Sequence, residues 1–145
     1  MNKYNYLWIL ILLAGIIGTF FLIKTAYANP LSLPSYAFTN PQIKEGYTFA
    51  KLNETELNGL PCNCGCMTSA HGGGRIHTRG LLDCFMKGDV NNGGTWDSHA
   101  SECSSCYQDA LSVKQLLEQG KTKEDIKIIL VNKYSTQKIS NNTVY

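Results

Sequence analysis

The hydrophobic positions divide the chain into one long apolar run and a later part where apolar residues recur at helical spacing. From Tyr4 to Ile23 run 20 residues without charge, flanked by Lys3 and Lys24. A run of this length is sufficient to span hydrocarbon as a helix. We therefore expect residues 1–28 to form a transmembrane helix, a signal anchor or a signal peptide.

Two outcomes are open for this segment. Ala26-Tyr27-Ala28 before Asn29 has the small-x-small form of a signal cleavage site, so removal after Ala28 is one of them. The apolar run is longer than the usual signal core of about 7 to 15 residues, and Lys24 precedes the site, which favours an uncleaved anchor. Either route places the remaining chain on the extracytoplasmic side of the cell membrane, secreted if cleavage occurs.

The clearest helical pattern lies in the C-terminal part. From Cys103 to Leu117, apolar and cysteine positions recur in steps of three and four, which predicts one helix. Asp97 or Ser98 is expected to cap its start, and Gly120 to end it.

A second helix is expected to follow at once, since Thr122 and Asp125 have the spacing of a capping box. Its predicted buried face consists of Ile126, Ile129, Leu130 and Tyr134. The two helices predict a helical hairpin, and residues 135–145, rich in Asn, Ser and Thr, predict a flexible tail.

The N-terminal half of the domain shows weaker patterns. Residues 29–46, with three prolines, predict a tether, so the cysteine-rich domain is expected at 47–134. Glu54 to Leu60 predicts a helical turn, and the apolar run from Leu81 to Met86 fits a helix or a strand equally. The expected fold class is mainly α: a loop-rich N-terminal half and a C-terminal helical hairpin, preceded by one transmembrane or signal helix.

Charge narrows the function classes. The chain has 13 Lys+Arg and 11 Asp+Glu, and only Lys3 and Lys24 precede residue 29. The later part is therefore formally neutral. Without a basic stripe it offers nucleic-acid phosphates little to bind, and we expect no nucleic-acid partner.

The six cysteines supply the chemistry, and all lie between Cys62 and Cys106. In an extended strand Cys62, Cys64 and Cys66 would share one side with Cα atoms about 6.5 Å apart, near the upper limit for a disulfide. A turn at Gly65 could instead aim all three sulfurs at one ion.

A second group of ligand-type residues follows in the order His99-x3-Cys103-x2-Cys106, a spacing that places all three on one face of a helix. Cys84 lies between the groups, and His71 or His77 could add a nitrogen, although both are expected to be solvated. Such a sulfur-rich set selects copper or zinc, and less readily an iron-sulfur cluster. The predicted metal ligands are Cys62, Cys64, Cys66, Cys84, His99, Cys103 and Cys106, with His71 and His77 as weaker candidates.

Two other interpretations stay open. An even number of cysteines outside the cytoplasm is typical of a disulfide framework, which would make the domain a stapled interaction module. Cys103 and Cys106 near a helix start could also act as the redox pair of a thiol-disulfide oxidoreductase. Catalysis is otherwise not indicated, and the predicted partners are the membrane and a protein that donates metal, accepts metal or exchanges thiols.

The loop Pro61-Cys62-Asn63-Cys64-Gly65-Cys66, the Cys84-Phe85 step and the Trp96-Asp97-Ser98-His99 block with its two following cysteines resemble the PCYCGC-motif family of exported proteins. Asn63 stands where the family name has tyrosine. The resemblance covers roughly residues 47–134 and implies export and a shared site, with no established reaction.

A weaker resemblance covers Cys103 to Tyr134. This part is similar to the helical hairpin of the thiol-reducing subunit that prepares apocytochromes c for haem attachment, and it favours the redox alternative. The Gly-Lys-Thr junction between the helices is also a common capping solution.

Overall fold

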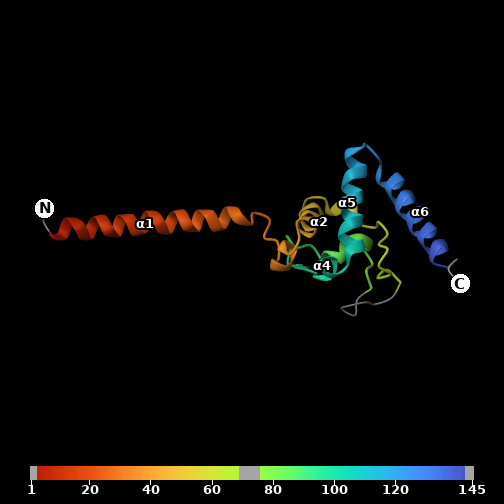
Figure 1. Cartoon of the computed structure of the whole chain (residues 1–145), viewed down its shortest axis with the longest axis horizontal. Coiled ribbons are helices and arrows are strands. Elements are labelled where there is room, and N and C mark those ends of the chain that lie inside the picture. Colours follow the sequence, from red (N-terminus) through yellow and green to blue (C-terminus); the bar gives the residue numbers. More distant parts are fainter. Residues whose placement is uncertain (1–2, 69–75, 143–145) are drawn as a thin grey trace. The chain divides into compact units, whose positions relative to one another are not determined.

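The computed structural model describes residues 3–68 and 76–142 and divides the chain into two compact units, Met1–Leu33 and Pro34–Tyr145. In the first unit, helix α1 runs from Lys3 to Ala28 (Figure 1). Within residues 3–68 and 76–142, no helix has the combined length and hydropathy of a membrane span. The predicted transmembrane helix is therefore not confirmed.

The second unit is mainly helical, as predicted. Its elements, with η for 3-10 helices, are η1 Ser35–Phe38, α2 Pro41–Leu52, α3 Glu54–Leu57, η2 Gly80–Cys84, β1 Met86–Lys87, β2 Thr95–Trp96, α4 His99–Glu102, α5 Ser104–Glu118 and α6 Lys123–Asn142. The predicted turn after Glu54 is α3, and the ambiguous run after Leu81 forms η2 and β1. Helix η1 and the start of α2 lie within residues 29–46, which were expected to be an irregular tether.

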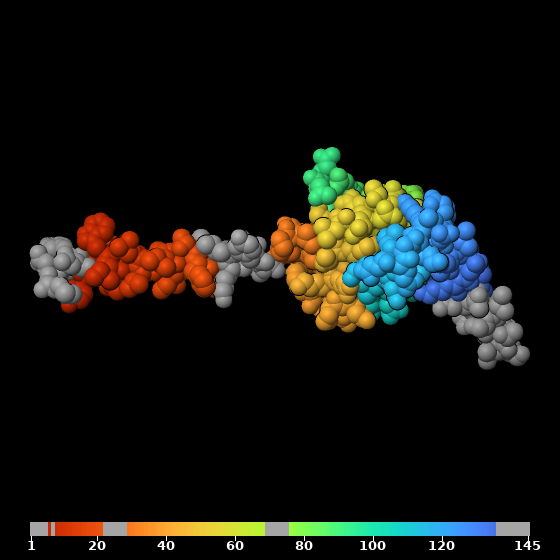
Figure 2. Space-filling view, turned by 90° about the horizontal axis from the view of Figure 1, so that it is seen from above, coloured from red at the N-terminus to blue at the C-terminus, as the bar shows by residue number. Residues whose placement is uncertain are grey.

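Helix α2 forms because its start is well capped and one of its faces is apolar. The Asn40 side chain accepts a hydrogen bond from Gln42 N at 2.8 Å, and Pro41 occupies the first turn, where its missing N–H costs nothing. A Cβ on the buried Gly46 would lie 3.1 Å from Tyr107 Cβ on α5. The glycine thus lets α2 pack closely on α5, which lies between α2 and α6 in Figure 2.

The helical hairpin of α5 and α6 is confirmed. Gly120, at φ +78°, ends the first helix, and Lys121 N donates to Leu116 O at 3.0 Å, as in a Schellman turn. Thr122 and Asp125 form the predicted capping box, with Asp125 N donating to Thr122 Oγ1 at 3.2 Å.

Two details of α6 differ from expectation. Ile129 is 39% exposed, whereas Ile126 and Leu130 are buried. The buried stripe is narrower than predicted because α6 packs mainly against α5. The helix also continues to Asn142, into the segment from residue 135 that was expected to be a flexible tail.

The single helix expected from Asp97 or Ser98 to Gly120 is wrong. The chain forms α4 and α5 as separate helices, because Cys103 adopts an extended conformation with φ −113° and ψ 107°. Cys103 N donates a hydrogen bond to His99 O at 2.9 Å, which ends α4. Cys103 O accepts a hydrogen bond from Cys106 N at 3.1 Å in the first turn of α5.

The cysteine loop is held against the segment that leads to Cys84. Three backbone hydrogen bonds join them: Gly59 N to Arg79 O (2.9 Å), Leu81 N to Leu60 O (2.8 Å) and His77 N to Cys66 O (2.8 Å). Gly80 lies in the middle of this backbone clamp with φ +65°, and a Cβ there would be 2.1 Å from Leu60 O. Only glycine allows so close an approach.

An aromatic cluster fixes the other side of the unit. Tyr47 of α2 meets Phe85 and Trp96 edge to face, at centroid distances of 5.1 and 5.8 Å. Its hydroxyl donates to the backbone oxygen of Asp97 at 2.6 Å. Strands β1 and β2 pair antiparallel, with Met86 opposite Trp96. Together these contacts fix the segment that enters α4.

Replacing Gly80 by alanine is expected to open the backbone clamp. Gly80→Ala and Gly93→Ala both place alanine at positive φ, but nothing lies within 4 Å of a Cβ at Gly93. The clash with Leu60 O should therefore destabilise Gly80→Ala by about 1 to 3 kcal/mol beyond the control. Urea unfolding followed by circular dichroism measures the difference, and equal free energies of unfolding for the two variants would contradict the close approach.

Removing the Tyr47 hydroxyl should leave the Asp97 carbonyl without this donor in a buried site. Tyr47→Phe is expected to lower the free energy of unfolding by about 1 to 3 kcal/mol. Tyr36→Phe is the matched control, because the ring of Tyr36 packs on Tyr47 at 5.7 Å and no hydrogen bond of its hydroxyl is recorded among the described residues. A loss no greater than that of the control would show that the hydrogen bond contributes little.

Candidate metal centre

The cysteine loop turns sharply, as its glycine predicts. Gly65 has φ +79°, and its backbone oxygen accepts hydrogen bonds from Thr68 N at 3.1 Å and Thr68 Oγ1 at 3.0 Å. Cys62 and Cys66 are buried on the inner side of this turn, and Cys64 is half-buried. The loop therefore directs its thiols inward through a turn, and not through the extended strand that would also have placed them on one side.

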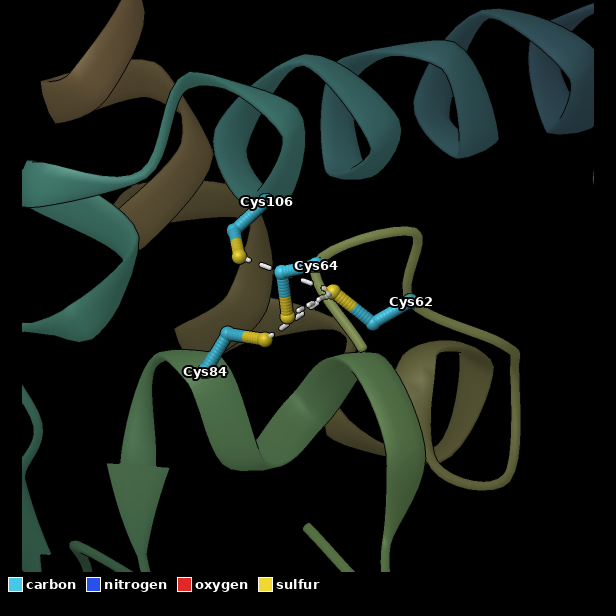
Figure 3. Close-up of side chains that lie close together, drawn as sticks. All are labelled: Cys62, Cys64, Cys84 and Cys106. Carbon is cyan, nitrogen blue, oxygen red and sulfur yellow. Dashed lines mark hydrogen bonds between the residues drawn. The ribbon is translucent and has the colours of Figure 1, made fainter. Parts of the chain in front are cut away.

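Four sulfurs meet where three segments converge. The loop supplies Cys62 and Cys64, the end of η2 supplies Cys84, and the first turn of α5 supplies Cys106 (Figure 3). From Cys62 Sγ the distances are 3.0 Å to Cys64 Sγ, 3.4 Å to Cys84 Sγ and 3.5 Å to Cys106 Sγ. All four sulfurs lie within 4.8 Å of one another, so this four-sulfur group could hold a metal ion.

The remaining donors lie beside the four-sulfur group. Cys66 Sγ is 3.2 Å from His99 Nε2, and these two atoms form a second group with Cys64 Sγ. His99 also groups with the sulfurs of Cys103 and Cys106. The structure thus brings together all seven residues that were favoured as metal ligands, while their role as ligands stays a prediction.

His99 is positioned by the residue that leads into α4. Asp97 Oδ1 accepts a hydrogen bond from His99 N at 2.9 Å, and Asp97 N donates to Phe85 O at 2.8 Å. The predicted convergence of His99, Cys103 and Cys106 is present, but two short helices with a break at Cys103 produce it, and not one helix face.

His77 was expected to be solvated, and that expectation is wrong. The side chain is 3% exposed, with Nδ1 3.4 Å from Cys84 Sγ and its ring edge to face with that of His99 at 5.2 Å. The backbone hydrogen bond from His77 N to Cys66 O carries it inward. His71 lies outside the described residues.

The thiols of the centre differ in acidity. Hydrogen bonds from Cys106, Cys62 and Cys84 hold the pKa of Cys64 well below its ordinary range. The pKa of Cys106 is raised by its hydrogen bonds with Cys62, Cys64 and Cys84 and further by burial. Burial, followed by the hydrogen bond with Cys64, raises the pKa of Cys66 to about 12. Cys64 is therefore the thiol that ionises, while the thiols of Cys66 and Cys106 keep their protons near neutral pH.

Two buried carboxylates beside the centre were missed by sequence reasoning. Asp83, in η2, accepts hydrogen bonds from Arg79 N at 2.9 Å and Arg79 Nε at 2.7 Å. Asp109, on α5, pairs with Lys133 at 3.1 Å and accepts a hydrogen bond from the Tyr134 hydroxyl. The four-residue spacing of Arg79 and Asp83 could have indicated the first pair, whereas the second joins two helices and leaves no local pattern.

A cavity of about 350 Å³ lies next to the cysteine loop. Its lining residues are Cys62, Asn63, Gly65, Met67, Thr68 and Tyr134. Met67, which follows the last cysteine of the loop, is 38% exposed, so its soft thioether sulfur lies at the protein surface beside the cavity. Of the four-sulfur group, Cys62 borders this cavity.

Comparisons with known proteins identify the family. The family model described as a protein of unknown function with PCYCGC motif matches residues 23–142. Searches of curated proteins and of solved structures give no significant match. The similarity of the C-terminal hairpin to the thiol-reducing subunit of cytochrome c maturation is not shown by these comparisons. With the motif at Pro61 to Cys66 and a match over most of its length, the chain belongs to the PCYCGC-motif family.

Proposed function

We propose that this protein binds a soft metal ion, copper(I) or zinc(II), in the four-sulfur group and passes it to or from a partner. The observation that carries the proposal is the meeting of Cys62, Cys64, Cys84 and Cys106 from three separate segments. A tetrahedral ion with metal–sulfur bonds of about 2.3 Å separates its sulfurs by about 3.8 Å. Sulfur distances of 3.0 to 3.5 Å need only a small outward shift.

The chemistry of the donors supports this choice of metal. Thiolate sulfur and imidazole nitrogen are the ligands that copper(I) and zinc(II) prefer, whereas magnesium and calcium require oxygen. Exchange with a partner is supported by the cavity next to Cys62 and by the partial exposure of Cys64. An extracytoplasmic location belongs to the same proposal and is supported by the apolar segment from Tyr4 to Ile23.

The redox and disulfide alternatives predict other outcomes. All six cysteines are free thiols in the structure. Cys106 Sγ lies 3.5 Å from Cys62 Sγ, within hydrogen-bonding distance, and within 4.8 Å of Cys103 Sγ, its partner in the redox alternative. Counting thiols in the full chain before and after unfolding separates the functions. Six thiols in the unfolded chain, at least four of which become reactive in the folded chain only after chelation, support metal binding, whereas three inert bridges, or one easily reduced bridge, would contradict it.

Cys84→Ser should weaken the binding of the first ion. Losing one of four thiolates is expected to lower zinc affinity by at least about 100-fold, because serine is a poor ligand for a soft ion. Ser105→Ala is the matched control, since Ser105 adjoins Cys106 and supplies no donor to the centre. Anaerobic competition with a chromophoric chelator gives both affinities, and unchanged zinc affinity in Cys84→Ser would exclude the four-sulfur group as the site.

Metal binding should release protons and weaken in acid. The pKa of Cys106 is raised in the metal-free protein, so its thiol must lose a proton when an ion binds. Zinc affinity is therefore expected to fall at least about tenfold for each pH unit below neutral. Calorimetry in buffers of different ionisation enthalpy measures the release, and a binding enthalpy independent of the buffer would show that the thiols were already ionised.

A further inference from the structure

The centre contains more donors than one ion can use. Six cysteines together with His77 and His99 form a continuous set, whereas a tetrahedral ion takes four ligands. The donors fall into three groups, each with atoms within 4.8 Å of one another: Cys62, Cys64, Cys84 and Cys106; Cys64, Cys66 and His99; and His99, Cys103 and Cys106. A single ion in the first group leaves Cys66, Cys103 and His99 without a metal.

The overlap between these groups shows where a second ion could bind. Cys64 Sγ belongs to the four-sulfur group and also to the group of Cys66 and His99. Cys66 is fully buried, and its sulfur lies 3.2 Å from His99 Nε2, so both donors already face one point. A thiolate sulfur has several lone pairs, and soft ions that lie close together commonly share it.

We propose that the centre binds two soft metal ions joined by the sulfur of Cys64. The first is held by Cys62, Cys64, Cys84 and Cys106, and the second by Cys64, Cys66 and His99. This inference rests on the proposed metal-binding function and extends it. With three protein ligands, the second ion keeps a position open for an outside ligand, as exchangeable and catalytic sites do. This open position gives a partner a way to exchange the second ion as well as the first.

The group of His99, Cys103 and Cys106 is the weaker location for the second ion. Cys103 is half-exposed, and no contact between its sulfur and His99 is recorded among the described residues at hydrogen-bonding distance. Cys66, by contrast, is buried and already in contact with the imidazole. Cys66→Ser and Cys103→Ser therefore form a matched pair that separates the two locations.

Cadmium(II) tests the number of ions and the bridge together. The full chain, reduced and kept without oxygen in mild detergent, is loaded with ¹¹³Cd(II) and examined by native mass spectrometry and ¹¹³Cd NMR. Two bound ions with mutually coupled ¹¹³Cd resonances are expected, because scalar coupling passes through a shared sulfur. Two uncoupled resonances would overturn the bridge. One bound ion would overturn the second site but leave the proposed function intact, and no bound ion would overturn both.

The variants locate the second ion. Cys66→Ser is expected to reduce the bound cadmium from two ions to one, with the four-sulfur resonance retained, whereas Cys103→Ser keeps two. The reverse result would move the bridge from Cys64 to Cys106 and overturn the assignment. His99→Gln, which removes a half-buried ring and no core sulfur, should also bind one ion; it tests the second site but not its location, because His99 belongs to both groups. If Cys66→Ser fails to fold, Cys103→Ser still decides the location, since loss of the second ion in that variant would overturn the assignment.

Discussion

The pairing of the cysteine loop with the segment before Cys84 is the constraint on which the centre depends. The backbone clamp brings Leu60 O to Leu81 N and Cys66 O to His77 N, and it succeeds only because Gly80 has no Cβ to strike Leu60 O. These hydrogen bonds use main-chain groups, so the thiols and the imidazole of His77 can point inward. Without this pairing, Cys62 and Cys84 would belong to two unconnected loops, and no short-range pattern would bring their sulfurs together.

The helices supply the remaining wall of the centre. Packing of α2 on α5 depends on the close approach at Gly46, and it fixes the first turn of α5, from which Cys106 projects. Tyr47 reaches from α2 to the backbone of Asp97, which in turn orients His99. The buried Asp109 fastens α6 to α5 through the exposed Lys133 and the half-buried Tyr134. Removal of these partners is costly, because it leaves the Asp109 carboxylate as a buried charge.

The two sides of the centre differ in the acidity of their thiols and in their access to solvent. Cys84 and Cys106 are buried among other sulfurs, and thiols in such a place resist ionisation until a cation replaces their protons. On the other side, Cys62 lines the cavity and Cys64 is half-buried. A centre with one partly accessible edge suits the uptake and release of an ion.

Local patterns determined the helical class, the hairpin of α5 and α6, its glycine stop and its capping box, because each depends on residues within a few positions of one another. Spacing also selected the donor residues, since sulfur and imidazole chemistry is visible in the sequence. The break at Cys103, the burial of His77 and the exposure of Ile129 were decided by the tertiary structure. They depend on which segments pack together, and the contacts that join residue 60 to residue 81, or Tyr47 to Asp97, leave no periodic trace along the chain.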